Sequence, residues 1–411
     1  MKGIGGQSVM VVGGGVAGMT AALDFAYMGF AVHLVEKSDR LGGQVGRLDK
    51  LYPTDHCAFC PLWTQIMQCK ENPGITIHTN TEVKRMEREG AGLQVSLLER
   101  PALVDEGKCV FCGRCETRCP VLPVPAIRPL KGHVYPPVYG IDTKTCTLCG
   151  DCEKACPTGA IRLKQTAEEV VLTVAEVVWA TGFQEADLSR FEEFGYGSHL
   201  DIMGSLEFEA WISEGGANKG DIRRRSLPSV PHSIAFIQCV GARDKRHLAH
   251  CSAVCCMHAL KQAHWIRKRR PEILCTIFYT DLRTVGKNFF AYAQACQENA
   301  TIELVRGRPA SVLPSAGGKE ILVSFENTMT RKVGHRGFDM VVLNGALQPS
   351  SAPEDIGRSD TWITGLPKGE TLRRAPPFTC GFCREPADMI ESVIQASSAV
   401  LQACLRMEGE R

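Results

Sequence analysis

The sequence predicts an α/β protein with two nucleotide-binding-type units and a small α+β module inserted into the first of them. Three observations carry this prediction. A glycine-rich loop at residues 13–18 lies between an apolar run and a helical pattern near the start of the chain. A second strand, loop, helix and strand pattern begins at Ser233, and eight cysteines stand in two runs of four between the glycine loop and Ser233.

The composition is that of an ordinary globular protein with one exception. The 411 residues include 47 Lys and Arg against 45 Asp and Glu, and 44% of them are hydrophobic. A single core stops growing at about 250 to 300 residues, so we expect two or three domains. The near-zero net charge disfavours a nucleic-acid or membrane-surface protein, which would concentrate positive charge on one face. The exception is cysteine, with 20 copies.

The N-terminus and the apolar stretches give no sign of secretion or membrane insertion. The apolar stretches, such as residues 177–180, are far shorter than the roughly 20 residues that cross a bilayer. Residues 1–16 are studded with glycine and lack the cleavage site of a signal peptide. Because most cysteines stand at metal-ligand spacing rather than in a disulfide framework, we expect a cytoplasmic, oxygen-sensitive protein.

The glycine loop predicts a dinucleotide site. Ser8–Val12 is a short apolar strand, and a helical pattern follows the loop. The first glycine allows the tight turn, the second lets the backbone approach a pyrophosphate, and the third permits close packing of helix on strand. The predicted cofactor-binding residues of this loop are Gly13, Gly15, Val16, Ala17 and Gly18.

The next strand, Ala31–Val35, delivers Glu36, whose carboxylate is placed to accept the hydroxyls of a ribose. A glycine-rich turn without a ligand is the alternative, and it leaves Glu36 unexplained. The segment from Arg40 to Gln44 and the strand that ends in Ala180, Thr181 and Gly182 resemble motifs of flavoproteins of the thioredoxin reductase and glutathione reductase type. This resemblance implies FAD in the first unit, with further contacts from Lys37, Arg40, Gly42, Gly43, Gln44, Ala180, Thr181 and Gly182.

The two cysteine runs each have the spacing CxxCxxCxxxCP. Such runs bind two 4Fe–4S clusters, and the fourth cysteine of each run ligates the cluster of the other run. One predicted cluster therefore uses Cys109, Cys112, Cys115 and Cys156, and the other uses Cys146, Cys149, Cys152 and Cys119. Zinc is the alternative, but structural zinc sites take their four ligands as two pairs.

The position of the cysteine runs suggests an insertion. Alternating apolar residues predict a strand meander that breaks off at residues 100–105 and resumes after the cysteines. The expected meander strands are Thr76–Thr79, Val83–Met86, Leu93–Leu98, Ile161–Leu163 and Val170–Val174. A ferredoxin module thus lies in a loop of the FAD domain, a layout suited to electron relay.

The second unit keeps its strand, Ser233–Gln238, but lacks a glycine loop for NAD(P)H. The loop reads Cys239-Val-Gly-Ala-Arg-Asp, three further cysteines follow, and a helix is expected over Met257–Arg270. A cluster in place of the pyridine nucleotide is one interpretation. Buried or redox-active thiols are the other.

These segments, with the later motif Gly381-Phe-Cys-Arg-Glu-Pro, resemble the A subunit of heterodisulfide reductase, HdrA, over nearly the whole chain. The resemblance implies a third 4Fe–4S cluster on Cys239, Cys251, Cys255 and Cys256. It also implies that Lys261 lies at the N5 edge of the flavin, where it would be the catalytic residue; a solvated helix lysine is the alternative. The helix expected over Asp388–Leu405 would point its N-terminus at the flavin ring.

The resemblance implies an electron-transfer subunit with FAD and three 4Fe–4S clusters. In length and layout the chain is similar to QmoA, the HdrA-like flavoprotein of a quinone-interacting complex of sulfate reducers, and by this resemblance we expect neither an N-terminal extension nor a second ferredoxin domain. The implied partners are other subunits of an Hdr-like or Qmo-like complex, with ferredoxin, a sulfur-pathway reductase or a membrane quinone-interacting subunit beyond them. Electron bifurcation and simple relay both stay open.

Two rival functions are an NAD(P)H-dependent oxidoreductase like the small subunit of glutamate synthase, and a non-catalytic wiring subunit. The chain has no nucleophile-elbow serine and no HExxH motif for hydrolysis. The expected organisation is an FAD domain in three segments (1–103, 166–231 and 336–411), a ferredoxin insert (104–165) after the first segment, and a degenerate NAD-type domain (232–335) after the second.

Overall fold

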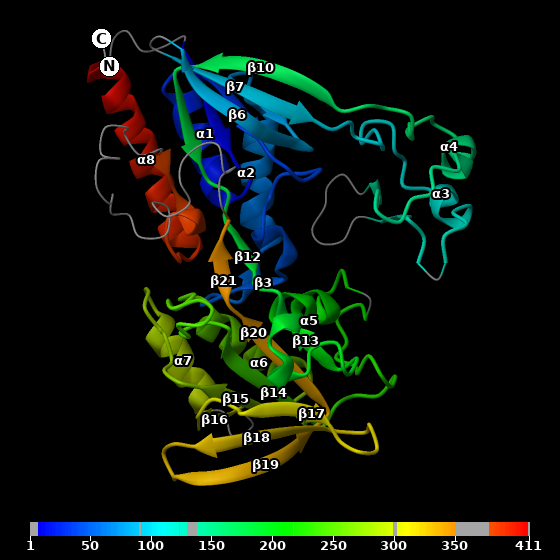
Figure 1. Cartoon of the computed structure of the whole chain (residues 1–411), viewed down its shortest axis with the longest axis vertical. Helices are drawn as coiled ribbons and strands as arrows, with labels where there is room; N and C mark the ends of the chain where they lie inside the picture. Colours follow the sequence, from blue (N-terminus) through cyan, green and yellow to red (C-terminus); the bar gives the residue numbers. More distant parts are fainter. Residues whose placement is uncertain are drawn as a thin grey trace.

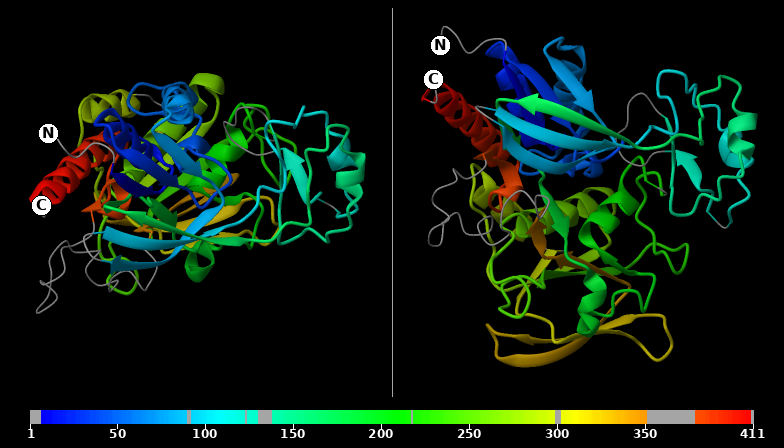
Figure 2. Two further views of the ribbon diagram at one scale, coloured as in Figure 1. Left: turned by 90° about the horizontal axis from the view of Figure 1, so that it is seen from above. Right: turned by 45° about the horizontal axis from the view of Figure 1, so that its top comes forward.

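The computed structural model describes residues 7–89, 92–122, 124–129, 138–216, 218–298, 302–350 and 378–409. Two parallel sheets, each covered by helices, form two units joined by a narrow pair of strands (Figure 1). A third, smaller module carries helices α3 and α4 and projects from the side of the first unit in every view (Figure 2).

The first sheet is entirely parallel, in the order β22-β11-β1-β2-β5. Its strands are β1 (Ser8–Val12), β2 (Ala31–Val35), β5 (Ile75–His78), β11 (Glu176–Trp179) and β22 (Phe378–Thr379). Helices α1 (Val16–Tyr27), α2 (Phe59–Glu71) and α8 (Met389–Gly409) cover one face with a continuous apolar core. The predicted strands at 8–12 and 31–35 are confirmed.

A three-stranded antiparallel meander covers the other face of this sheet. It consists of β6 (Thr81–Glu89), β7 (Gly92–Glu99) and β10 (Glu168–Val174). The assignment of Thr76–Thr79 to the meander is wrong, because this segment is β5 and pairs in parallel with β2 at the edge of the first sheet. An edge strand and a meander strand both alternate apolar and polar residues, so periodicity alone cannot separate them.

The small module leaves the meander after β7 and returns before β10. Its two ends are held together by a bridge between Val104 and Ile161, flanked by backbone hydrogen bonds. Ile161–Leu163, expected to resume the meander, instead closes the base of the module. Inside lie α3 (Arg114–Thr117), α4 (Asp151–Ala155), β8 (Ile127–Pro129) and β9 (Tyr139–Ile141).

Strands β12 (Phe183–Glu185) and β21 (Leu347–Pro349) pair antiparallel and connect the two units. The second sheet is parallel, in the order β13-β20-β14-β15-β16. Its strands are β13 (Ile202–Gly204), β14 (Ser233–Val240), β15 (Leu274–Tyr279), β16 (Ile302–Arg306) and β20 (Met340–Gly345). Helices α5 (Ser205–Ile212), α6 (Cys255–Arg269) and α7 (Phe289–Gln297) cover one face, and β17 (Ser311–Pro314), β18 (Ile321–Asn327) and β19 (Lys332–Phe338) cover the other.

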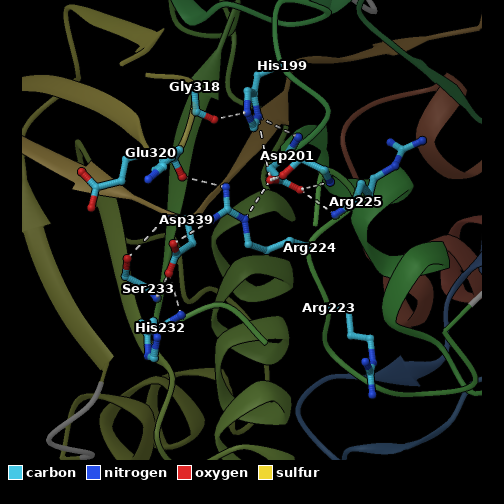
Figure 3. A network of polar contacts seen from close by, with 12 residues as sticks. His199, Asp201, Arg223, Arg224, Arg225, His232, Ser233, Gly318, Glu320 and Asp339 are labelled. Carbon is cyan, nitrogen blue, oxygen red and sulfur yellow. Dashed lines mark hydrogen bonds and ion pairs between the residues drawn. The ribbon is translucent and has the colours of Figure 1, made fainter. Parts of the chain in front are cut away.

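A buried polar network ties together the N-terminal edge of the second sheet (Figure 3). Asp201, which has no exposed surface, precedes β13 and accepts hydrogen bonds from the Arg224 guanidinium at 3.0 Å and from the backbone N–H of Arg225 at 2.6 Å. Arg224 also donates to Asp339, which precedes β20, at 3.0 Å. The network fixes the strands at the edge opposite to the cysteines, which lie where β14 ends.

Among the described residues, no helix combines the length and the apolar character needed to span a lipid bilayer.

Candidate flavin site and cysteine clusters

The glycines of residues 13–18 serve two different purposes. Gly13 has φ +114°, and a Cβ there would lie 2.2 Å from the Ala180 carbonyl oxygen. A Cβ on Gly18 would lie 1.7 Å from the Gly13 oxygen, so the fold itself needs both glycines. A Cβ on Gly15, in contrast, would meet nothing closer than Gly43 Cα at 3.8 Å. The open backbone at Gly15 starts helix α1, and it fits a bound pyrophosphate.

The predicted ribose-binding carboxylate lies against this loop. Glu36 follows β2, and its Oε2 accepts a hydrogen bond from the Gly14 N–H at 2.6 Å. The backbone of Gly42 donates to the Gly14 oxygen at 2.8 Å, so the segment after Glu36 is fastened to the loop. Lys37 is solvent-exposed, and Arg40 pairs with Asp39 at 2.8 Å.

The Ala-Thr-Gly motif meets the same loop from β11. Ala180 donates its N–H to the Val12 oxygen at 2.8 Å, and Thr181 donates its hydroxyl to the Ser350 oxygen at 3.1 Å. Gln44 reaches across to the Phe183 carbonyl at 3.2 Å. The structure therefore brings three segments of distant sequence, 13–18, 36–44 and 180–182, to the head of helix α1.

The first residues of the C-terminal region complete this environment. A Cβ on Gly381 would lie 2.9 Å from Ala17 Cβ, so the short helix η7 (Gly381–Cys383) abuts the start of α1. Cys380 and Cys383 are both buried, and the Cys383 thiol donates to the Trp179 oxygen at 3.4 Å. Helix α8 follows from Met389, close to the predicted start at Asp388.

The two cysteine runs of the small module adopt the same backbone conformation. Phe111 and Leu148, at equivalent positions, have φ of 54° and 56°. Gly113 and Gly150 have φ of 78° and 84°, and each precedes a short helix. The repeat in the sequence is therefore a repeat in structure, with one run folded like the other.

The runs enclose two cavities, and each cavity takes cysteines from both runs. One is lined by Cys109, Cys112, Cys115 and Cys156, together with apolar side chains. The other is lined by Cys119, Cys146, Cys149 and Cys152. Three cysteines of one run thus share a cavity with the fourth cysteine of the other, which is the grouping that the spacing predicts. Among the described residues no three His, Cys, Asp or Glu side chains form a site for a single metal ion.

The thiols of the two runs have matching electrostatics. Burial raises the pKa of Cys115 to about 11 and raises that of Cys152. Burial also opposes ionisation of Cys119 and Cys156, but hydrogen-bond donors to their sulfurs outweigh it and lower the pKa of both thiols. These donors include the backbone N–H groups of residues 126 and 160, each 3.3 Å from sulfur. Such N–H donors also suit a cluster, whose sulfurs accept hydrogen bonds.

The third cysteine set gathers at the head of helix α6. Cys239 lies near the end of β14 with φ +60°, Cys251 lies in the following loop, and Cys255 and Cys256 begin the helix. Burial, reinforced by the nearby thiols of this set, raises the pKa of Cys256 to about 11 and also raises the pKa values of Cys239 and Cys255. A cluster binds thiolates, so its binding would release the thiol protons, and the iron ions would then balance the negative charge of the sulfurs.

Lys261 lies one turn further along α6 and is not exposed. Its ammonium donates to Glu209 Oε1 at 2.5 Å and to the Lys50 carbonyl at 3.0 Å. The alternative that Lys261 is a solvated helix lysine is therefore wrong, and its side chain lies at the junction of the two units. Its contact with a flavin stays a prediction.

Several polar groups near this junction have no signal in the sequence. Glu209 of α5 is fully buried, and Gln238 of β14 and Asn344 of β20, which follow the paired residues Ile237 and Leu343, are 3% and 1% exposed. Among the described residues the amide atoms of both have no hydrogen-bond partner. Tyr52, on the hairpin of β3 (Lys50–Leu51) and β4 (His56–Cys57), is electrostatically coupled to Cys255 and Asp388.

Comparison with known proteins agrees with these features. The family model described as FAD dependent oxidoreductase matches residues 8–48, and the 4Fe-4S binding domain model matches residues 102–123 and 139–162. The structure of Lactococcus lactis thioredoxin reductase has a TM-score of 0.56 at 15% identity and covers 98% of this chain and 99% of its own. The predicted thioredoxin reductase-like fold with a ferredoxin-type module is confirmed.

Two curated relatives are iron-sulfur A subunits of CoB–CoM heterodisulfide reductase. The one from Methanocaldococcus jannaschii is 37% identical over 98% of this chain and 64% of its own length. One from Methanopyrus kandleri is 36% identical over 96% of this chain and 63% of its own length. The chain spans just under two thirds of these relatives, and the specific likeness to QmoA stays a prediction. By sequence, fold and cofactor-type modules, the chain is HdrA-like, being similar over nearly its whole length to the iron-sulfur A subunits of heterodisulfide reductase.

Proposed function

We propose that this chain is the FAD and iron–sulfur subunit of a larger oxidoreductase, in which it moves electrons between a flavin and three 4Fe–4S clusters. When bound, FAD supplies two-electron chemistry and the clusters supply one-electron steps. The observation that carries the proposal is the grouping of twelve cysteines, eight around two cavities and four at the head of α6.

The chain's own residues have distinct tasks in this proposal. The backbone of residues 13–18 cradles the pyrophosphate, with Glu36 on the ribose. Thiolates of the three cysteine sets hold the clusters. Arg243, which lies beside Cys239 and pairs with Asp281 at 2.8 Å, offsets the negative charge of the third set. Lys261 is positioned to hold a proton at the junction of the units, where we place the reactive edge of the flavin.

The arrangement supports a relay through the junction. Tyr52 is coupled on one side to Cys255 and Cys256 and on the other to Asp388 and Glu391 at the start of α8. The third cysteine set therefore lies near the helix start at which we expect the flavin ring. The small module projects from the first unit (Figure 2), and we propose that other proteins of a complex contact it there.

The relatives support a proposal about the partners of this chain. We propose that the chain works with other subunits of an Hdr-like or Qmo-like complex, and that its electrons are exchanged with a disulfide, ferredoxin or quinone branch. By the same resemblance, cleavage of a heterodisulfide belongs to a different subunit. Bifurcation and simple relay are both compatible with this layout.

The test is the iron and FAD content of anaerobically purified protein, compared with a Cys255→Ser, Cys256→Ser variant. Three clusters give about 12 irons per FAD, falling to about 8 in the variant. About 8 irons in both proteins would remove the third cluster from the proposal. Rapid bleaching of the flavin by NADPH would favour the NAD(P)H-dependent alternative instead.

A further inference from the structure

Glu185 is the last residue of β12, the strand that leads from the first unit into the second. Its side chain lies against two glycines at the C-terminal edge of the second sheet. A Cβ on Gly345 would lie 3.0 Å from Glu185 Cγ, and a Cβ on Gly204 would lie 3.6 Å from both carboxylate oxygens. The carboxyl group fits there because the last residue of both β13 and β20 is a glycine, which has no side chain.

This position is close to the predicted flavin site. Phe183, on the same short strand, accepts a hydrogen bond from Gln44 at 3.2 Å, and its ring lies 4.6 Å from that of Phe382 in η7. Gly182 of the Ala-Thr-Gly motif directly precedes the strand. Glu185 is therefore three residues from Gly182, which is predicted to contact FAD, and its strand also contacts Gln44 of the second predicted cofactor segment.

The charged neighbours of Glu185 do not compensate its charge. Arg47 in the short helix η1 (Val45–Arg47) faces it from the first unit but is itself exposed. Glu207 and the Ser205 hydroxyl face Glu185 from α5. The Tyr196 phenol, which follows η3 (Glu192–Phe194), interacts with Glu185 electrostatically. One carboxylate oxygen, Oε1, is buried and has no hydrogen-bond partner among the described residues.

Burial is the main reason that the pKa of Glu185 is raised to about 7. Arg47 opposes this shift, and Glu207 reinforces it. A carboxyl group in this condition responds to small changes in nearby charge, because added negative charge favours its neutral form.

We propose that Glu185 is a redox-linked proton site of the junction: its carboxylate takes up one proton from solvent when electrons enter the adjacent cofactors, and releases it when they leave. Glu185 itself is neither oxidised nor reduced, and the only bond that forms or breaks is the O–H bond of its carboxyl group. The incoming electron adds negative charge, and the proton bound at the carboxylate offsets it. The inference rests on the proposed FAD site and deepens it by naming where a compensating proton is held.

The test uses the holoprotein and reduced-minus-oxidised infrared difference spectroscopy near pH 7, with dithionite as the reductant. The wild-type protein should gain a C=O band of a protonated carboxylic acid on reduction. Glu185→Gln should lose this band and take up fewer protons per flavin reduced. Glu192→Gln, an exposed carboxylate on the neighbouring η3, is the matched control and should keep both.

Absence of the band in wild type, or its persistence in Glu185→Gln, would overturn the inference. Glu185→Asp provides a second variant if the glutamine protein folds poorly, since it should shift the band rather than remove it. The proposed function fails in a different way, through protein that binds no FAD or whose flavin is not reduced. If the flavin is bound and reduced but the carboxylic acid band does not appear, only the proposed role of Glu185 is rejected.

Discussion

The ammonium of Lys261 lies 2.5 Å from Glu209 Oε1, and neither side chain is exposed to solvent. The pair joins α6 to α5, and a further hydrogen bond from Lys261 to the Lys50 carbonyl extends it to the hairpin of the first unit. Glu209 also accepts hydrogen bonds from Gln262 at 2.9 Å and from the Asp49 backbone at 3.1 Å. Both units are thus tied to one buried ion pair.

Removing one member of this pair should destabilise the protein. Lys261→Met leaves the Glu209 carboxylate buried without its cation, which costs about 3–5 kcal/mol. Combining it with Glu209→Leu removes both charges and should cost less than the two single changes added together. The measurement is the urea midpoint of each variant.

Lys268→Met is the control, because Lys268 is exposed and pairs with Asp55 on the same hairpin at 2.8 Å. Exposed pairs contribute about 0.2–1 kcal/mol. A Lys261→Met midpoint no lower than that of Lys268→Met would contradict the importance of the buried pair.

Acid should weaken the second unit through Asp201 (Figure 3). Burial opposes its ionisation, but the Ser226 and Arg224 donors outweigh this and lower the pKa of Asp201. A carboxylate whose pKa is lower in the folded state adds stability above its unfolded pKa, and this stability is lost as the pH falls. The unfolding midpoint of wild type should therefore drop between about pH 5 and pH 3, and Asp201→Asn should start lower and drop less. Parallel curves for the two proteins would rule out this source of acid sensitivity.

The features that could be predicted from the sequence are those encoded by residues close together in the chain. Both parallel sheets, the glycine loop and the two cysteine runs follow local patterns of strand, helix and turn, so they were accessible without a structure. The error at β5 arose because alternation does not reveal a strand's partner. Glu209 and Glu185 were missed for a related reason: each meets its partners across about 20 to 160 residues of sequence, and no local pattern marks such contacts.

Gly15→Ala should separate cofactor binding from folding. The new methyl group meets nothing closer than 3.8 Å, so the protein should fold with an unchanged thermal midpoint in its flavin-free form. The same methyl group stands where we place the pyrophosphate, so FAD content should fall sharply. Gly18→Ala is the contrasting variant, because its methyl group would lie 1.7 Å from the Gly13 oxygen and should disturb the fold itself. Wild-type FAD content in Gly15→Ala would place the cofactor elsewhere.

The grouping of the cysteines around two cavities can be tested with paired double variants. If Cys109 and Cys156 hold the same cluster, as their shared cavity suggests, Cys109→Ala with Cys156→Ala should remove only one cluster, about four irons per chain. Cys109→Ala with Cys119→Ala should remove both clusters of the module, about eight irons, because Cys119 lines the other cavity. If each run instead held its own cluster, the two results would be exchanged. Iron analysis with electron paramagnetic resonance of the reduced proteins therefore distinguishes crossed from uncrossed ligation, since both variants lose two cysteines and differ only in which two.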